Sequence, residues 1–229
     1  MSKVIITGSM GNLGTEVSKH LTDNNYEVIG CDFKLGHDLT DENFVIDFFQ
    51  KNTANYLVNL YAFNPHVSDD AGTNLFDIDL NSIDRYLKVN LTSLFSVCRE
   101  FAKNNKRGSI VNISSTYGLV SPTQHIYEPG KEKHIGYSVS KAAVAHMSRC
   151  LAVSLAPNIR VNAIAPGGVE FSPKNDQDRI FKESYEKNTP MKRMMKVHEL
   201  NGIIEYLCSE KSSYCTGSVF SVDGGWTAW

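Results

Sequence analysis

Two patterns of apolar and polar positions alternate along the chain. Short apolar runs rich in β-branched residues and bounded by turn residues predict buried strands. Such runs occur at 3–7, 27–31, 56–60, 109–113, 159–164 and 218–222. Longer stretches with apolar residues three or four positions apart predict helices at 41–51, 80–103, 137–155 and 198–208. This alternation of strands and helices predicts a parallel sheet with helices on both faces.

The connection after the second strand is short. Only five residues separate Asp32 from Asp38, too few for a full crossover helix, so we expect this crossover to be trimmed to a loop or a short turn. The expected fold class is α/β, with a single Rossmann-like doubly wound parallel sheet of about seven strands flanked by helices. A chain of 229 residues fits one such domain, spanning 1–229.

Three longer segments interrupt the alternation, at 62–79, 116–136 and 168–196. Each follows a strand on the carboxyl-end side of the expected sheet. Because open α/β sheets bind their ligands in the crevice at that edge, we expect these segments to shape the functional site.

Composition and charge narrow the class of partner. The net charge of −2 gives no electrostatic reason to expect nucleic acid. The five cysteines are odd in number, scattered and without paired metal spacing, which indicates a reducing compartment, the cytoplasm. The N-terminus shows no long apolar signal region, and no apolar run approaches the length of a membrane span, so we expect no membrane partner.

Glycines 8, 11 and 14 follow the first strand and open a helix. Such a turn lets a pyrophosphate approach the backbone, and the helix N-terminus supplies free N–H groups and positive potential. Asp32 ends the second strand, 18 residues after Gly14, near the spacing of a carboxylate that binds a ribose. This carboxylate would repel a 2′-phosphate, so NAD is favoured over NADP, although Lys34 is near enough to soften that repulsion.

Tyr137 and Lys141 lie four positions apart, on one face of the helix expected at 137–155. A cation beside a phenol favours the phenolate and lowers the pKa of the tyrosine toward a range useful for acid–base chemistry. Such a pair is common on solvated helix faces. Here it follows a strand that ends in Ser114 and Ser115, so the pair warrants attention only together with the rest of the chain.

Taken jointly, motifs across nearly the whole chain resemble the short-chain dehydrogenase/reductase family. The segments that carry the resemblance are TGSMGNLG (7–14), HDLTD (37–41), LVNLYA (57–62), DRYLKVNL (84–91), IVNISS (110–115), YSVSK (137–141), IRVNAIAPGGV (159–169), TPMKRM (189–194) and GSVFSVDGGW (217–226). Four features depart from the usual pattern. Of LVNLYA, which stands where the family has an Asn-Asn-Ala-Gly motif, only Asn59 matches well. Asn12 replaces a glycine of the shorter family branch, Phe171 stands where a threonine is usual, and the 22 residues from Ser115 to Tyr137 form a longer gap than usual.

The resemblance implies hydride transfer between a nicotinamide cofactor and an alcohol or ketone. Tyr137 would exchange the hydroxyl proton, Lys141 would lower the pKa of Tyr137 and bind the nicotinamide ribose, and Ser115 would bind the substrate oxygen. Asn90 would bend its helix and hold a water linked to Lys141. The implied cofactor-binding residues are Gly8, Met10, Gly11, Asn12, Leu13, Gly14, Asp32, Asp38, Leu39, Asn59, Tyr61, Tyr137, Lys141, Pro166, Gly167 and Val169. His66, His125 and His134 form no ligand pattern, so no metal is expected.

The substrate segments are polar. The insert 116–136 is rich in hydrogen-bonding side chains, and 187–196 carries Lys187, Lys192, Arg193 and Lys196, which either form a solvated helix edge or meet an anionic group. We expect a polyhydroxylated, sugar-like substrate, with or without a phosphate or nucleotide group. The stretch YGLVSPTQHIYEPG and the GGWTAW terminus are similar to family members tied to sugar or polysaccharide metabolism.

Two other functions stay open. The glycine spacing resembles the extended branch and suits a sugar-nucleotide epimerase or dehydratase, but those relatives usually carry a further C-terminal substrate domain. A non-enzymatic nucleotide sensor would share the fold, but such relatives tend to lose the Tyr-Lys pair. The resemblance also implies a homodimer or homotetramer, with contacts through the helices at 80–103 and 137–155.

Overall fold

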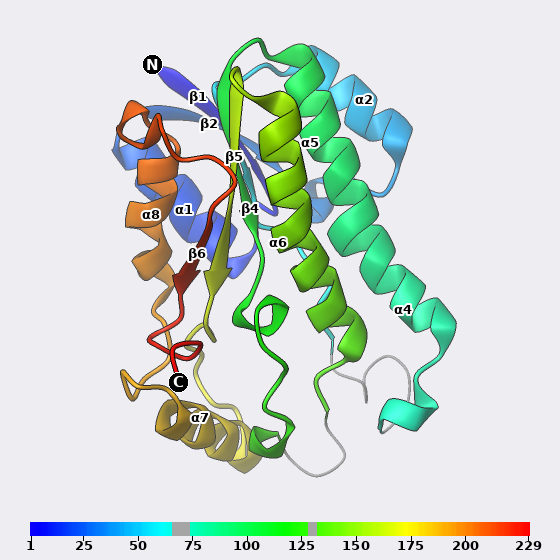
Figure 1. The fold of residues 1–229 in the computed structure, drawn as a ribbon, viewed down its shortest axis with the longest axis vertical. Coiled ribbons are helices and arrows are strands. Elements are labelled where there is room, and N and C mark those ends of the chain that lie inside the picture. The colour runs from blue at the N-terminus through cyan, green and yellow to red at the C-terminus, as the bar shows by residue number, and fades with distance from the viewer. Residues whose placement is uncertain (66–73, 128–131) are drawn as a thin grey trace.

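A computed structural model describes residues 1–65, 74–127 and 132–229 of the chain (Figure 1). Six parallel strands form one sheet in the order β2-β1-β3-β4-β5-β6. They are β1 Ser2–Thr7, β2 Tyr26–Cys31, β3 Tyr56–Asn59, β4 Gly108–Ile113, β5 Ile159–Pro166 and β6 Val219–Val222. The expected doubly wound sheet is confirmed, with six strands among the described residues rather than about seven. The trimmed connection after β2 forms only the 3₁₀ turn Phe33–Leu35 and adds no strand.

Helices cover both faces of the sheet (Figure 1). The α-helices of the described residues are α1 Asn12–Asp23, α2 Glu42–Lys51, α4 Leu80–Leu87, α5 Ser93–Asn104, α6 Ile135–Leu155, α7 Asp176–Asn188 and α8 Asn201–Leu207. The sheet has a hydrophobic core on each face, and successive side chains of β1 point alternately into the two cores. Ile5 joins the core under α2, α5 and α6, whereas Val4 and Ile6 join the core under α1 and α8. Burial on both faces explains why the strands read as continuous apolar runs.

The helix expected at 80–103 is interrupted. The structure has α4, a π-helical turn at Lys88–Thr92, and then α5. Periodicity could not reveal the interruption, because apolar or aromatic side chains before and after it are both buried, Tyr86 against His134 and Phe63, and Leu94, Val97 and Phe101 in the core. The interruption places Asn90 in the interior, where its side chain is 2% exposed.

One helix was missed, and another starts differently. The segment 168–196 contains α7, which is mostly charged and so lacked the apolar stripe that identifies a helix. Its N-terminus is capped by Asn175, whose side chain accepts a hydrogen bond from the Asp178 N–H. The helix expected at 198–208 begins as the 3₁₀ turn Val197–Leu200 before α8.

The carboxyl ends of the strands meet at one edge of the sheet, and α7 lies beyond the ends of β5 and β6 (Figure 1). Within the three described ranges, none of the helices combines the length and apolar character needed to span a membrane.

Candidate active site

The glycine turn after β1 leaves no room for side chains. Gly8 has a φ of +73°, and a Cβ there would lie 2.6 Å from the Tyr61 nitrogen. A Cβ on Gly14 would lie 2.0 Å from the Gly8 carbonyl oxygen. Only glycine fits these two positions, because a side chain at either one would collide with the backbone opposite.

The same turn leaves the start of α1 open. Gly11 is the N-cap residue, and no side chain in the described part of the chain caps this end. The first turn carries no acidic residue, so its N–H groups and helix dipole are available to an anion. Met10, Gly11 and Asn12 are exposed at this turn, and Leu13 lines the neighbouring cleft.

Asp32 joins the end of β2 to the glycine turn. Its carboxylate accepts hydrogen bonds from the backbone N–H groups of Met10 and Lys34, each at 2.9 Å. The Lys34 ammonium donates to the Met10 carbonyl oxygen at 3.2 Å. The carboxylate is therefore held at the place where the ribose of a dinucleotide would lie if its pyrophosphate bound the start of α1.

Asp38 and Leu39 follow on the trimmed connection. Asp38 accepts hydrogen bonds from the Thr40 hydroxyl and N–H, and these bonds lower the pKa of its carboxyl group. Leu39 is 7% exposed and belongs to the core under α2. Its side chain is thus directed into the core.

The side chains of Asn59 and Tyr61 are engaged away from the cleft. Asn59 accepts a hydrogen bond from Thr7 at 2.7 Å and donates to Asn112 at 2.8 Å, in a buried polar network. The Tyr61 hydroxyl pairs with the Ser93 hydroxyl at 2.8 Å. Of this segment, the structure brings the backbone at Tyr61 close to the glycine turn, so a cofactor contact from here would come from the main chain.

Ser114 and Ser115 end β4 and face different partners. The Ser114 hydroxyl donates to the Lys141 carbonyl oxygen at 2.7 Å and so fastens α6 to the strand end. Ser115 lies beside the Tyr137 phenol in the cleft and lowers its pKa, and the Ser115 oxygen accepts from the Tyr117 N–H at 3.1 Å. The 22-residue excursion therefore folds back, and Ser115 is the serine that meets Tyr137.

Lys141 lies beside Tyr137 but is bonded elsewhere. Its ammonium donates to the Ile113 carbonyl oxygen at 2.8 Å and lies 5.9 Å from the centroid of the Tyr137 ring. Burial lowers the pKa of Lys141 to about 8. Burial raises the pKa of Tyr137, and the neighbouring Ser115 offsets only part of that rise. The pKa of Tyr137 is therefore raised in this structure rather than lowered as expected, because burial of the phenol outweighs the effects of its neighbours.

Asn90 lies behind the cleft and joins three segments. Its side-chain oxygen accepts from the Phe63 N–H at 2.7 Å, and its amide donates to the Phe63 carbonyl at 2.9 Å. The amide also donates to the Ser140 hydroxyl at 3.0 Å, next to Lys141 on α6. Asn90 thus fixes the loop after β3 against the helix that carries Tyr137.

A cleft of about 380 Å³ brings these parts together. It extends from Leu13 at the glycine turn past Ser115, Tyr137 and Lys141. Its lining also includes Asn64, Tyr117, Tyr127, Lys133, Pro166, Gly167, Gly168, Val169, Phe181 and Tyr185. Of the residues predicted to form the site, the structure thus gathers Leu13, Ser115, Tyr137, Lys141, Pro166, Gly167 and Val169 around one cavity.

Lys133 is a lining residue that sequence reasoning missed. It is 7% exposed, and its ammonium lies 4.4 Å from the centroid of the Tyr137 ring. A lysine inside a polar insert is usually solvated, so no sequence signal distinguished it.

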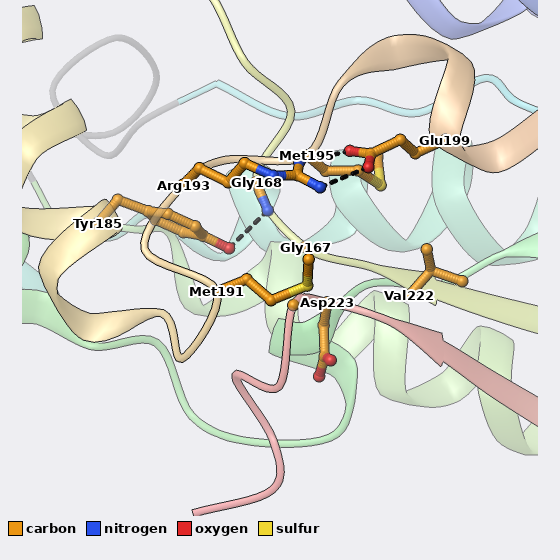
Figure 2. Close-up of a pocket in the computed structure, with 10 residues that line it drawn as sticks. Gly167, Gly168, Tyr185, Met191, Arg193, Met195, Glu199, Val222 and Asp223 are labelled. Atoms are coloured by element: carbon orange, nitrogen blue, oxygen red, sulfur yellow. Dashed lines mark hydrogen bonds and ion pairs between the residues drawn. The ribbon is translucent and has the colours of Figure 1, made fainter.

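Figure 2 shows the adjoining cavity beyond the Pro-Gly turn. The Gly168 N–H donates to the Tyr185 hydroxyl at 2.5 Å, and Tyr185 stacks on Trp226 with ring centroids 4.4 Å apart. Arg193 makes two hydrogen bonds to the Glu199 carboxylate, at 2.7 and 2.6 Å (Figure 2). The guanidinium of the basic 187–196 segment that lies nearest the site is therefore already neutralised.

The histidines are placed as separate residues. His134 is buried, accepts from the Gly136 N–H at 2.9 Å and pairs with the Ser82 hydroxyl at 2.8 Å. His125 is exposed, and His66 lies outside the described residues. The described residues contain no group of three metal-ligating side chains.

Comparisons with known proteins agree with this arrangement. A family model described as Enoyl-(Acyl carrier protein) reductase matches residues 11–227. The 3-oxoacyl-[acyl-carrier-protein] reductase FabG of Aquifex aeolicus is 31% identical over 231 residues, which cover 98% of this chain and 87% of that protein. The D-arabinitol 2-dehydrogenase [ribulose-forming] of Scheffersomyces stipitis is 39% identical over 153 residues, 62% of this chain and 52% of that protein.

A solved structure shares the whole fold. The short-chain dehydrogenase from Leptospira borgpetersenii, crystallised with bound NAD+, superposes with a TM-score of 0.82 at 26% identity, covering 99% of this chain and 92% of that one. Sequence and fold therefore lead to the same assignment: the chain belongs to the short-chain dehydrogenase/reductase family, whose members are NAD(P)-dependent oxidoreductases.

Proposed function

We propose that this protein interconverts a secondary alcohol and a ketone of a polar, sugar-like substrate, with NAD as the preferred cofactor. One observation carries the proposal. Ser115, Tyr137 and Lys141 line one cleft that reaches the glycine turn, and Ser115 lies near enough to the Tyr137 phenol to lower its pKa. A substrate oxygen between the two hydroxyl groups would be placed for proton exchange.

The residues present fit a dinucleotide. Gly8 and Gly14 let the turn pack tightly on neighbouring backbone, and the uncapped start of α1 offers N–H donors to a pyrophosphate. Asp32 would accept hydrogen bonds from ribose hydroxyls and repel a 2′-phosphate, which supports NAD. Met10, Gly11, Asn12, Asp38 and Leu39 would contact the adenosine half. Tyr61, Pro166, Gly167 and Val169 would contact the nicotinamide half, and Asn59 would support that wall through its buried network.

The chain's own groups handle the proton. When bound, the nicotinamide accepts or supplies the hydride. Tyr137 takes the proton of the alcohol on oxidation and returns it on reduction, while Ser115 holds the same oxygen and stabilises developing charge. Lys141 carries a buried positive charge beside the phenol, which favours its ionised form during the transfer. Asn90 keeps α6 and the loop after β3 in register, so that Tyr137 stays aligned.

The cleft supports a polar substrate. Serine, threonine, asparagine, lysine and tyrosine side chains form much of its wall, and the partial match to a D-arabinitol dehydrogenase supports a polyol. The match to a 3-oxoacyl-[acyl-carrier-protein] reductase covers 98% of this chain, which makes a 3-oxoacyl thioester the second candidate substrate.

The assembly and location of the protein are part of the same proposal. Phe95 on α5, together with Val139 and Val153 on α6, exposes apolar surface that a second copy would cover in a homodimer or homotetramer. Five free cysteines fit the reducing cytoplasm. Light scattering coupled to gel filtration gives the mass, and a monomer at micromolar concentration contradicts this assembly.

The test is a spectrophotometric assay at neutral pH. NAD or NADP is supplied with polyols, sugars, sugar phosphates and nucleotide sugars, and NADH or NADPH with 3-oxoacyl thioesters and simple ketones. We expect reduced cofactor to accumulate with polar secondary alcohols. Turnover of apolar ketones alone contradicts the substrate class, and conversion of a nucleotide sugar without net NADH identifies an epimerase.

A Tyr137→Phe variant completes the test. It should lose at least about a thousandfold in kcat because the phenolic proton is removed, while NADH binding measured by fluorescence remains. Tyr26→Phe, at the opposite end of the sheet, is the control. Full activity of Tyr137→Phe overturns the catalytic assignment, and failure of the wild type to bind either dinucleotide overturns the proposed function.

A further inference from the structure

Lys133 is a cation built into the wall of the reaction cleft. Gln124 holds its backbone at two points: the Lys133 N–H donates to the Gln124 side-chain oxygen at 2.8 Å, and the Gln124 amide donates to the Lys133 carbonyl at 3.0 Å. The ammonium donates one hydrogen bond to the Asn64 side-chain oxygen and lies over the Tyr137 ring. Its position is thus fixed by three neighbours.

The charge of Lys133 has no counter-ion in the part of the chain that the structure describes. An ammonium has three N–H donors, and only one of them has an acceptor among the described residues. No carboxylate of the described chain lies within ion-pair distance of it. Two cations nearby differ, because Arg193 is paired with Glu199 and Lys182 with Glu170. Lys141 also lacks a carboxylate partner among the described residues, but its ammonium donates to the Ile113 carbonyl at the strand end.

Burying a charge without a partner costs folding free energy, and a ligand of opposite charge would offset that cost. Burial lowers the pKa of Lys133 to about 8, and no other cause contributes. At pH 7 the ammonium is therefore charged in a ratio of roughly ten to one. A negative group that entered the cleft would meet a charged, desolvated donor.

We propose that Lys133 binds an anionic group of the substrate, a carboxylate or a phosphate, a few bonds from the carbon that is oxidised or reduced. The short distance follows from the ring contact, since the ammonium lies over the same tyrosine whose hydroxyl exchanges the proton. The inference rests on the proposed function for the reaction and adds the substrate class, an acidic derivative of a polyol. The anionic group would thus be bound by Lys133, in the insert before α6, and not by the basic segment 187–196.

The first test measures binding without turnover. Wild type, Lys133→Gln and the exposed-lysine control Lys196→Gln are titrated calorimetrically with malonate and with inorganic phosphate, with and without NADH. We expect wild type and Lys196→Gln to bind at least one probe, and Lys133→Gln to bind it at least about tenfold more weakly. The inference is overturned if wild type binds neither probe or if Lys133→Gln binds as the wild type does.

The second test compares D-arabinitol, D-arabinonate and D-arabinitol 5-phosphate as substrates. The ratio of kcat/KM between an anionic member and the neutral polyol should favour the anion in the wild type and fall at least about tenfold in Lys133→Gln, mainly through KM. The carboxylate and phosphate arms separate the two sources of charge. If none of the three is oxidised and NADH does not bind, the proposed function fails, while the titration still decides the role of Lys133.

Discussion

The Lys141 ammonium donates to the Ile113 carbonyl oxygen at 2.8 Å, which ties the middle of the cleft to the last residue of β4. Lys141 is buried and lies near the Tyr137 ring without a carboxylate partner in the described structure. Its positive charge therefore acts on the phenol through a low-dielectric interior, where electrostatic interactions are strong.

Removing that charge should impair the proton transfer. We expect Lys141→Met to lower kcat about 10²- to 10⁴-fold, because the phenolate loses a buried cation from the same helix. NADH affinity should weaken as well, which fluorescence titration measures. Lys103→Met, on the exposed side of α5, serves as the control, and a Lys141→Met enzyme with more than a tenth of wild-type kcat contradicts the role.

The close approach of Gly14 to Gly8 makes a steric prediction. Gly14→Ala should lower Tm and abolish dinucleotide binding, because its Cβ would lie 2.0 Å from the Gly8 carbonyl oxygen. The matched control is Gly202→Ala, since a Cβ there meets no described atom within 4 Å. That second variant should be more stable than wild type by about 0.5–1 kcal/mol, because alanine is the better helix former. Calorimetry compares the three proteins, and equal Tm values for the two variants would refute the clash.

Asp32 should set the choice between the two nicotinamide cofactors. Asp32→Asn removes the charge that repels a 2′-phosphate but keeps an oxygen that can accept from the Met10 N–H. The ratio of kcat/KM for NADP to that for NAD should rise on the order of tenfold. Asp23→Asn, at the far end of α1, should leave the ratio unchanged. A wild type that already prefers NADP would show that Lys34 outweighs the carboxylate.

Lys133 should also make the free energy of unfolding depend on pH. The folded-state pKa is about 8 and the ordinary value is 10.5, so the burial cost is present in full below pH 8 and is lifted as the pH rises from 8 to 10.5. Lys133→Met should therefore be more stable than wild type at pH 7, by at most about 3 kcal/mol, with the difference shrinking toward pH 10.5. Urea unfolding at pH 7 and pH 10 measures it. A pH-independent difference would mean that Lys133 does not titrate as described.

The sheet and the main site residues could be read from the sequence because local patterns determine them. Continuous apolar runs marked every strand, and the spacing of Tyr137 and Lys141 placed them on one helix. The features that were missed depend on contacts between distant segments. The charged helix α7 is held by a few residues such as Tyr185, and the burial of Lys133 arises only when Gln124 and Asn64 fold around it.

The directions of two side chains were also beyond sequence reasoning. Asn59 stands at a position that resembles a cofactor contact, yet its amide is engaged by Thr7 and Asn112. The phenol of Tyr137 was expected to feel mainly the neighbouring cation, but its burial has the larger effect on its pKa. Both outcomes depend on how side chains compete for partners in the interior.

The π-helical turn between α4 and α5 changes the direction in which later side chains point around the axis of this long helix. A regular helix advances about 100° per residue, so the wider turn shifts every later side chain around the axis relative to those before it. Asn90 can thus point inward to Ser140 while Leu94, Val97 and Phe101 still face the sheet. A chain one residue shorter at this point would rotate one of these two sets out of place, so the length of the rod is as constrained as the identity of its residues.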